Sequence, residues 1–224
     1  AVRARPRVRL LRVLRVLCAC LAAWLAAHPA HAAPLPQATV SSAPMRPLDD
    51  FSPAFLGMFR KVMAIEPAIR GAATTHKVDL ALAEAVCMYE SGGNADLSSR
   101  VGAQGYFQVM PATARSLHAP SNIEAGVKYL AQLIERFGRE DYALAAYNGG
   151  PTRVGRGGPM PLESLQYVLG VGSYRSVLRQ YGAAVRAYAS RLQLATARPG
   201  DTWWTMSERL DVPGLQLRMH NPFL

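Results

Sequence analysis

Apolar residues recur at spacings of three and four along most of the chain after Asp50, a pattern that predicts α-helices. Phe55, Met58, Phe59 and Val62 form the first such apolar face. The pair Glu66-Pro67 is expected to start a second helix, because proline is accommodated in a first helical turn.

The next apolar run, 80–89, has Asp79 as a natural N-cap and predicts a helix that ends at Glu90-Ser91-Gly92. Further helices are expected at 111–117, at 122–137 after the capping box Ser121–Glu124, and at 141–147. The remaining helical patterns cover 162–169 and 174–192, on either side of the chain around Gly170 and Gly172. No strand alternation stands out before Ala197, so an all-α domain of short helices is predicted for residues 51–192.

The first thirty-two residues have the layout of a secretory signal peptide. An arginine-rich start precedes the apolar run Val13–Ala27, and Ala30-His31-Ala32 is the small-x-small pattern that signal peptidase cleaves. A membrane anchor is the alternative, but the apolar run is short for a bilayer span. We expect cleavage after Ala32, a Pro- and Ala-rich tether at 33–50, and export to the periplasm or cell envelope. Membrane contact is expected only through the signal peptide during export.

The positive charge of the chain is concentrated at this same end. Six arginines lie in the first fifteen residues, and without them the formal net charge of +10 falls to +4. The excess of basic residues therefore does not indicate a nucleic-acid-binding surface, and no nucleic-acid partner is expected. Cys87 is the one cysteine left after processing and is expected to be buried packing. No metal-ligand spacing and no phosphate-binding glycine motif occurs, so no metal and no cofactor are expected.

The candidate chemistry is centred on Glu90. A helix delivers this carboxyl group to the rim of the glycine-rich loop Gly92-Gly93-Asn94. Partial removal from water, and the negative end of the helix dipole, raise the pKa of a carboxyl group and keep it protonated near neutral pH. Glu90 therefore fits the role of a general acid.

Four strings in this order resemble the catalytic domain of the soluble lytic transglycosylases over about residues 60–185. They are Glu90-Ser91-Gly92 with Asn94, 102–108 (GAQGYFQ) with 110–114 (MPATA), 145–151 (AAYNGGP), and Glu163-Ser164 with Tyr167-Val168. The resemblance implies a lysozyme-like fold with a catalytic cleft. It differs from the family pattern at Ser164, where threonine is usual, and at Tyr106-Phe107, where Leu-Met is common.

The resemblance also implies the activity and the roles of single residues. The family cleaves the β-1,4 bond between N-acetylmuramic acid and N-acetylglucosamine in peptidoglycan and closes a 1,6-anhydro ring, with one glutamate as acid and then base. Glu90 corresponds to that glutamate. Substrate contacts are expected at Ser91, Gln108, Tyr147 and Asn148, with the Tyr147 hydroxyl holding the acid in place. Behind them, Glu163 beneath the cleft and Tyr167 are expected to support the site. Capping for Ser91, packing for Gln108 and a turn role for Asn148 are the structural alternatives.

Residues 193–224 resemble the start of a LysM module, which is normally βααβ and recognises N-acetylglucosamine-containing chains. The resemblance rests on Pro199-Gly200-Asp201-Thr202, Trp203-Trp204 and Asn221-Pro222. The sequence stops at Leu224, before the closing strand, so the first strand is expected to be unpaired in a fragment or a degenerate module. The missing initiating methionine also favours a fragment.

Two other functions stay open at this point. A lysozyme-type hydrolase would use water and a second carboxylate facing Glu90, for which Asp96 is the nearby acid in the sequence. A wall-binding protein without catalysis would have no need of Glu90. In every case the expected partner is the glycan strand of peptidoglycan.

Overall fold

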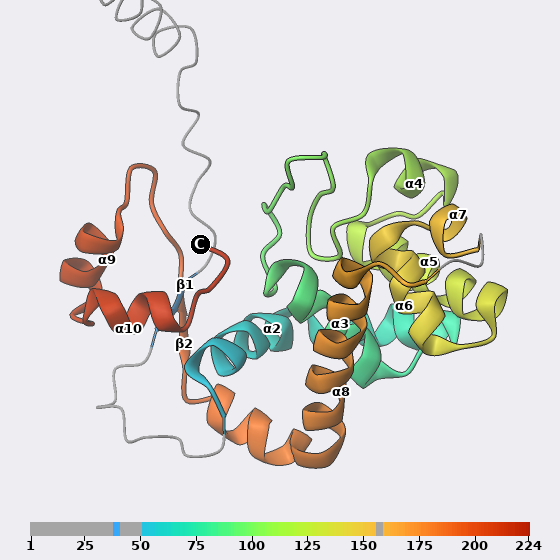
Figure 1. Ribbon diagram of the computed structural model, residues 1–224. Helices are drawn as coiled ribbons and strands as arrows, with labels where there is room; N and C mark the ends of the chain where they lie inside the picture. The colour runs from blue at the N-terminus through green and yellow to red at the C-terminus, as the bar shows by residue number, and fades with distance from the viewer. Residues whose placement is uncertain (1–37, 41–50, 156–158) are drawn as a thin grey trace, which may run out of the picture. The chain divides into compact units, whose positions relative to one another are not determined.

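The computed structural model describes residues 38–40, 51–155 and 159–224, all of which belong to one compact unit (Figure 1). Helices account for most of these residues, which confirms the all-α class. The elements in chain order are β1 (Ala38–Val40), α2 (Pro53–His76), α3 (Leu80–Ser91), α4 (Pro111–Ser116), α5 (Asn122–Phe137), α6 (Glu140–Gly149), α7 (Pro151–Val154), α8 (Leu162–Ala189), β2 (Gln193–Ala195), α9 (Trp203–Leu210) and α10 (Gly214–Met219). The predicted signal peptide and most of the tether lie outside the described residues.

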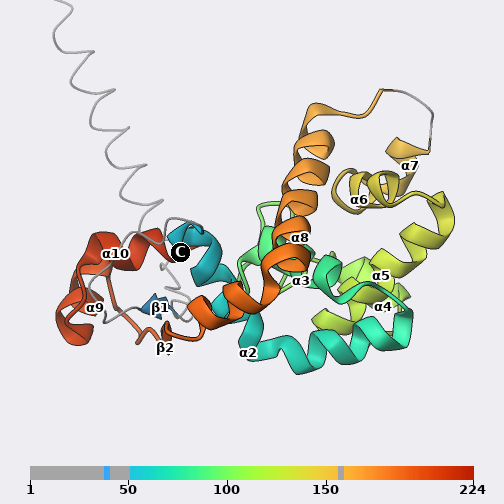
Figure 2. The ribbon, with the colours of Figure 1, turned by 90° about the horizontal axis from the view of Figure 1, so that it is seen from below.

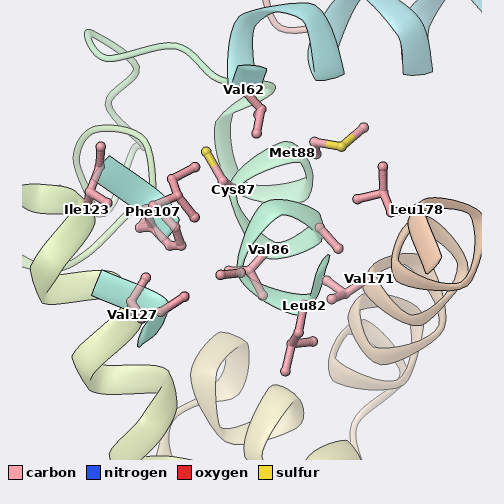
Figure 3. Packing of buried hydrophobic residues seen from close by; sticks show 14 of the residues in the cluster. Val62, Leu82, Val86, Cys87, Met88, Phe107, Ile123, Val127, Val171 and Leu178 are labelled. Carbon is pink, nitrogen blue, oxygen red and sulfur yellow. The ribbon is translucent and has the colours of Figure 1, made fainter. Parts of the chain in front are cut away.

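Helix α3 is the centre of the apolar core. It begins where the Asp79 carboxylate accepts a hydrogen bond from the Leu82 backbone N–H, 2.9 Å away, and it ends at Gly92 in the left-handed conformation. Its residues 82–88 are all buried. Figure 3 shows side chains of α3 meeting Val62 from α2, Val127 from α5 and Val171 from α8. Because α3 is covered on nearly all sides, its contacts with the neighbouring helices fix the position of its last turn.

The predicted break at Glu66-Pro67 is wrong, because α2 continues through Pro67. An interior proline costs about 3 kcal/mol through its missing N–H and its ring clash. Ile69 beyond the proline and Phe59 before it are both fully buried in the same core. Each such side chain contributes about 1.5–3 kcal/mol on burial, so packing on both sides of Pro67 offsets the local cost.

The two helices predicted at 162–169 and 174–192 are one helix, α8, with a kink at Tyr181 (φ −123°, ψ 16°). The two ribbon views show α8 running beside α3 (Figure 1 and Figure 2). Gly170 makes this approach close, since a Cβ atom there would overlap the ring of Tyr89. A glycine inside this helix is thus required by packing rather than by a helix end.

The capping box at the start of α5 is half formed. Ser121 Oγ accepts from the Glu124 N–H at 3.1 Å, as predicted. The Glu124 carboxylate, however, lies 2.5 Å from His76 Nε2 at the end of α2, where it forms an ion pair when the imidazole is protonated. This contact ties two helices together instead of satisfying the N-cap.

One short strand, β1, occurs where none was expected. β1 pairs antiparallel with β2 in the register Ala38↔Ala195, Thr39↔Leu194 and Val40↔Gln193. Residues 38–40 are therefore not tether, and the first strand of the C-terminal segment is not unpaired. Three residues give too little alternation to recognise, and the pairing joins parts of the chain far apart in sequence. The strand leads into α9 and α10, around a small cluster of Ala197, Met206, Val212 and Leu217.

None of the helices among the described residues is both long enough and apolar enough to span a bilayer.

Gly126 of α5 offers a test of the packing between α5 and the loop after α3. A Cβ atom at this position would overlap the buried ring of Phe107. We expect Gly126→Ala to lower the free energy of unfolding by about 1–3 kcal/mol, measured by urea denaturation, because overpacking strains the core. Gly71→Ala in α2, where no atom lies within 4 Å of the new Cβ, is the matched control and should stabilise by about 1 kcal/mol. Equal shifts in both variants would contradict the packing described.

Candidate functional site

Glu90 opens onto a hollow of about 480 Å³ at the end of α3. The hollow is lined by Glu90, Leu97, Ser98, Ser99, Val101, Ala103, Gln108, Met110, Tyr147, Asn148 and Glu163. A second hollow of about 360 Å³ adjoins it and shares Gln108, Met110, Tyr147 and Asn148. The second continues past Tyr129 to Gly150. The two hollows share four lining residues and so lie next to each other; together they are called the groove.

The Glu90 carboxyl group is partly buried, and this burial raises its pKa from 4.5 to about 7. One hydrogen bond opposes the shift: the Tyr167 hydroxyl donates to Glu90 Oε1 at 2.7 Å and favours the ionised form. Burial is the larger effect. The group therefore exchanges its proton close to neutral pH, where one side chain can act as an acid and then as a base.

The predicted role of Tyr147 is taken by Tyr167. The Tyr147 hydroxyl donates to the Phe107 carbonyl at 2.8 Å, not to Glu90. The two phenol rings are stacked, with centroids 6.4 Å apart, so they occupy adjacent positions behind the carboxyl group. Burial raises the pKa of both hydroxyls well above 10, and both stay protonated donors. Tyr147 thus fixes the loop and lines the groove, while Tyr167 of α8 holds the acid.

Ser91 is fully buried and does not line the hollow, so the expected contact with substrate is wrong. Its hydroxyl donates to the Tyr106 carbonyl at 2.8 Å. The same oxygen accepts from the N–H groups of Gly93 and Asn94, at 3.1 and 3.2 Å. Ser91 therefore joins the end of α3 to two segments of the following loop, Gly93-Asn94 and the chain at Tyr106.

Gln108 and Asn148 line both hollows, but each also has a structural partner. Gln108 has a left-handed backbone (φ 45°), and its Nε2 donates to the carbonyls of Leu97 and Gly105 at 2.8 and 2.9 Å. Asn148 is exposed, and its Oδ1 accepts from Ser164 Oγ at 3.3 Å. The amide nitrogen of Gln108 is thus used to shape the loop, which leaves its side-chain oxygen as the group with acceptor capacity for a ligand.

The two other candidate carboxylates, Glu163 and Asp96, differ in their position relative to the hollow. Glu163 is exposed at the start of α8 and lines the hollow itself, rather than lying beneath the cleft. Asp96 is exposed and is not among the lining residues. If a second acid contributes to chemistry in this hollow, Glu163 is better placed than Asp96.

Three further side chains shape the site and were not singled out from the sequence. Asn122 Oδ1 accepts from the Phe107 N–H at 2.9 Å, and its Nδ2 donates to the Gln104 carbonyl at 2.8 Å. Asn94 and Lys61 hold the other end of the loop. Asn94 belongs to the first motif and so had a signal. For Lys61 the sequence offers a weaker signal, a cation among the apolar residues of its helix.

Cys87 is buried as expected, and burial raises the pKa of its thiol. Within the described ranges, no group of three or more His, Cys, Asp or Glu side chains is arranged to hold a metal ion.

Known proteins resemble this chain over the segment that carries the groove. Residues 67–159 match the family model of the Transglycosylase SLT domain. The chain is 37% identical over 95 residues to a transglycosylase of Enterobacteria phage PRD1, over 40% of this chain and 36% of that protein. It is 36% identical over 89 residues to the soluble lytic murein transglycosylase of Salmonella typhimurium, over 32% of this chain and 14% of that protein.

A similar solved structure is an inactive mutant of the lytic transglycosylase Slt from Pseudomonas aeruginosa. It has 25% identity and a TM-score of 0.47, over 64% of this chain and 26% of that one. The chain spans little more than a third of the phage protein and a smaller share of the bacterial enzymes. The family match contains Glu90, Gln108 and Tyr147 and ends before Glu163 and Tyr167. Segment 67–159 of this chain, which carries Glu90, is therefore similar to the Transglycosylase SLT domain.

Proposed function

We propose that this protein is a peptidoglycan lytic transglycosylase in which Glu90 is the single acid and base. The observation that carries the proposal is a carboxyl group with a pKa near 7 that lines the groove and accepts a hydrogen bond from Tyr167. The family of the segment 67–159 supports the same reaction class. The substrate we propose is the β-1,4 bond between N-acetylmuramic acid and N-acetylglucosamine.

The proposed reaction needs two proton transfers at one carboxyl group. Protonated Glu90 first donates to the glycosidic oxygen, and the bond from that oxygen to the anomeric carbon of N-acetylmuramic acid breaks. The C6 hydroxyl oxygen of the same sugar then bonds to the anomeric carbon, and ionised Glu90 accepts the hydroxyl proton. The carboxyl group is regenerated, no water is consumed, and the product ends in a 1,6-anhydro ring. A pKa near the working pH suits both transfers.

Hydrolysis is the second candidate, because Glu163 lines the same hollow as Glu90. Two carboxylates across a scissile bond are what hydrolysing glycosidases use. The Tyr167 hydrogen bond and the burial that raises the Glu90 pKa would serve either reaction, so the chemical nature of the product separates them.

The remaining roles extend this proposal. Gln108, Tyr147 and Asn148 contact the glycan along the groove, while Tyr167 orients Glu90 and Glu163 faces the sugar whose charge develops. Export and the resemblance of residues 193–224 to part of a LysM module stay predictions from the sequence.

Glu90→Gln should lower kcat on purified peptidoglycan by about 10²–10⁴-fold, because the amide keeps the shape of the side chain but carries no transferable proton. Asp96→Asn, an exposed carboxylate outside the hollow, is the matched control and should keep wild-type turnover. Mass spectrometry of the wild-type products should find anhydro ends, one water lighter than reducing ends. Reducing ends would establish the hydrolase instead, and wild-type turnover in Glu90→Gln would refute the role of Glu90.

The same substitution should change the free energy of unfolding by an amount that depends on pH. The folded protein holds the Glu90 proton up to a pKa of about 7, whereas the unfolded chain releases it near 4.5, so wild-type stability falls as pH rises between these values. Relative to wild type, Glu90→Gln should gain up to about 3 kcal/mol at pH 8 and nothing at pH 4, measured by urea unfolding. A difference that is the same at both pH values would show that Glu90 has an ordinary pKa.

Tyr167→Phe and Tyr147→Phe form a matched pair, since the rings are stacked but only Tyr167 bonds to Glu90. Loss of the Tyr167 hydroxyl removes a bond that lowers the pKa of Glu90, so the fall of kcat/KM on the alkaline side should move to higher pH. In Tyr147→Phe this fall should stay at the wild-type pH, whatever its effect on KM. Equal behaviour of the two variants would contradict the assignment of roles.

A further inference from the structure

The end of the chain docks against the start of α2. A Cβ atom at Gly57 would overlap the backbone of His220, so only glycine permits this contact. His220 and Asn221 are almost completely buried, at 2% exposure each. Two residues on, the ring of Phe223 lies against Gly92 and Met58, because a Cβ atom built at Gly92 would be 2.6 Å from it. The C-terminal segment thus touches α2 and the residue that ends α3.

Lys61 joins this segment to the loop after Glu90. It is 3% exposed, and burial lowers its pKa to about 8. Its Nζ donates to Asn94 Oδ1 at 3.1 Å and to Asn221 Oδ1 at 3.2 Å. Asn221 is itself fixed, since its Nδ2 donates to the Leu217 carbonyl at 2.7 Å. Burial of an ammonium group costs free energy unless it has such partners. Because Asn94 and Asn221 bind the same ammonium group, the position of each amide constrains that of the other.

The contacts continue from Lys61 to the residue next to Glu90. Asn94 Nδ2 donates to the Ser91 carbonyl at 2.5 Å, and the Asn94 N–H donates to Ser91 Oγ at 3.2 Å. Between them, Gly92 and Gly93 have left-handed backbones, and Lys61 Cβ occupies the space that a Cβ of Gly93 would need. The loop is therefore enclosed by α2 on one side and the C-terminal segment on the other.

We propose that the segment His220–Phe223 is a positioning element for Glu90, acting through Asn221, Lys61 and Asn94 on the loop that ends α3. The coupling to catalysis rests on the proposed function, whereas the coupling to the loop does not. Lys61 and Asn221 lie on either side of the family match at 67–159, so this connection is a property of the present chain rather than of the matched segment.

The first experiment needs no activity. Hydrogen exchange of the Gly93 and Asn94 amides, followed by NMR, reports directly on their bonds to Ser91 Oγ. Asn221→Leu removes the oxygen bound by Lys61, and Gly57→Ala displaces the segment without changing a polar group. Both should speed exchange at these two amides by about tenfold or more, as expected when a local structure opens more readily. Unchanged exchange in both variants would overturn the proposal.

Kinetics then test the coupling to Glu90. In Asn221→Leu, kcat should fall by about tenfold, because small misplacement of a reacting group is costly. KM should stay within about twofold, because the groove is intact. Water that reaches Glu90 should also lower the pKa of its carboxyl group, so that kcat/KM falls on the alkaline side at a lower pH than in wild type. A loss of folded protein alone would not shift this pH. Asn221→Asp keeps an oxygen for Lys61 and should restore both values in part, because it still lacks the donor to the Leu217 carbonyl.

Leu215→Ala is the control, because Leu215 lies in α10, shortly before His220–Phe223, but is 72% exposed. It should match wild type in exchange, kcat and pH profile. If Asn221→Asp and Asn221→Leu are equally impaired, contact with Lys61 is not the link and the proposal fails. If wild type cleaves no peptidoglycan, the proposed function fails, and the exchange rates still decide whether the segment holds the loop.

Discussion

The burial of one carboxyl group at the end of α3 is the constraint on which the rest of the structure depends. An ionised carboxylate is disfavoured there both by partial loss of water and by the negative end of the helix. Tyr167 supplies one compensating hydrogen bond, which limits the rise in pKa without reversing it. The surroundings must therefore be rigid enough to limit water and open enough to admit the proposed glycan substrate.

Rigidity comes from ionic contacts that join the helices around α3. Arg186 of α8 pairs with Glu66 of α2 and with the buried Glu84 of α3. Arg175, the residue after Tyr174, pairs with Asp79 at the start of α3 and with Glu140 of α6. Breaking a pair that includes a buried carboxylate leaves an uncompensated charge, so the Arg186–Glu84 bridge in particular holds α8 against α3. The position of α8 in turn sets the distance from Tyr167 to Glu90.

Local signals were enough to predict part of this arrangement. Asp79 and Gly92 bound α3 in the sequence as they do in the structure, and both depend only on neighbouring residues. The motifs placed Glu90, Gln108 and Tyr147 at one groove for the same reason. What could not be predicted depends on packing between distant segments: the continuity of α2 through Pro67, the pairing of β1 with β2, and the exchange of roles between Tyr147 and Tyr167. Lys61 belongs to this class, because its partners are 33 and 160 residues away.

The most direct measurement is the titration of the Glu90 carboxyl carbon by ¹³C NMR, with Glu90→Gln used to assign the signal. The account predicts a midpoint near pH 7, because burial outweighs the hydrogen bond from Tyr167. A midpoint near the ordinary value of 4.5 would mean that the carboxyl group is ionised and hydrated at neutral pH, and it would contradict a proton donor at this position.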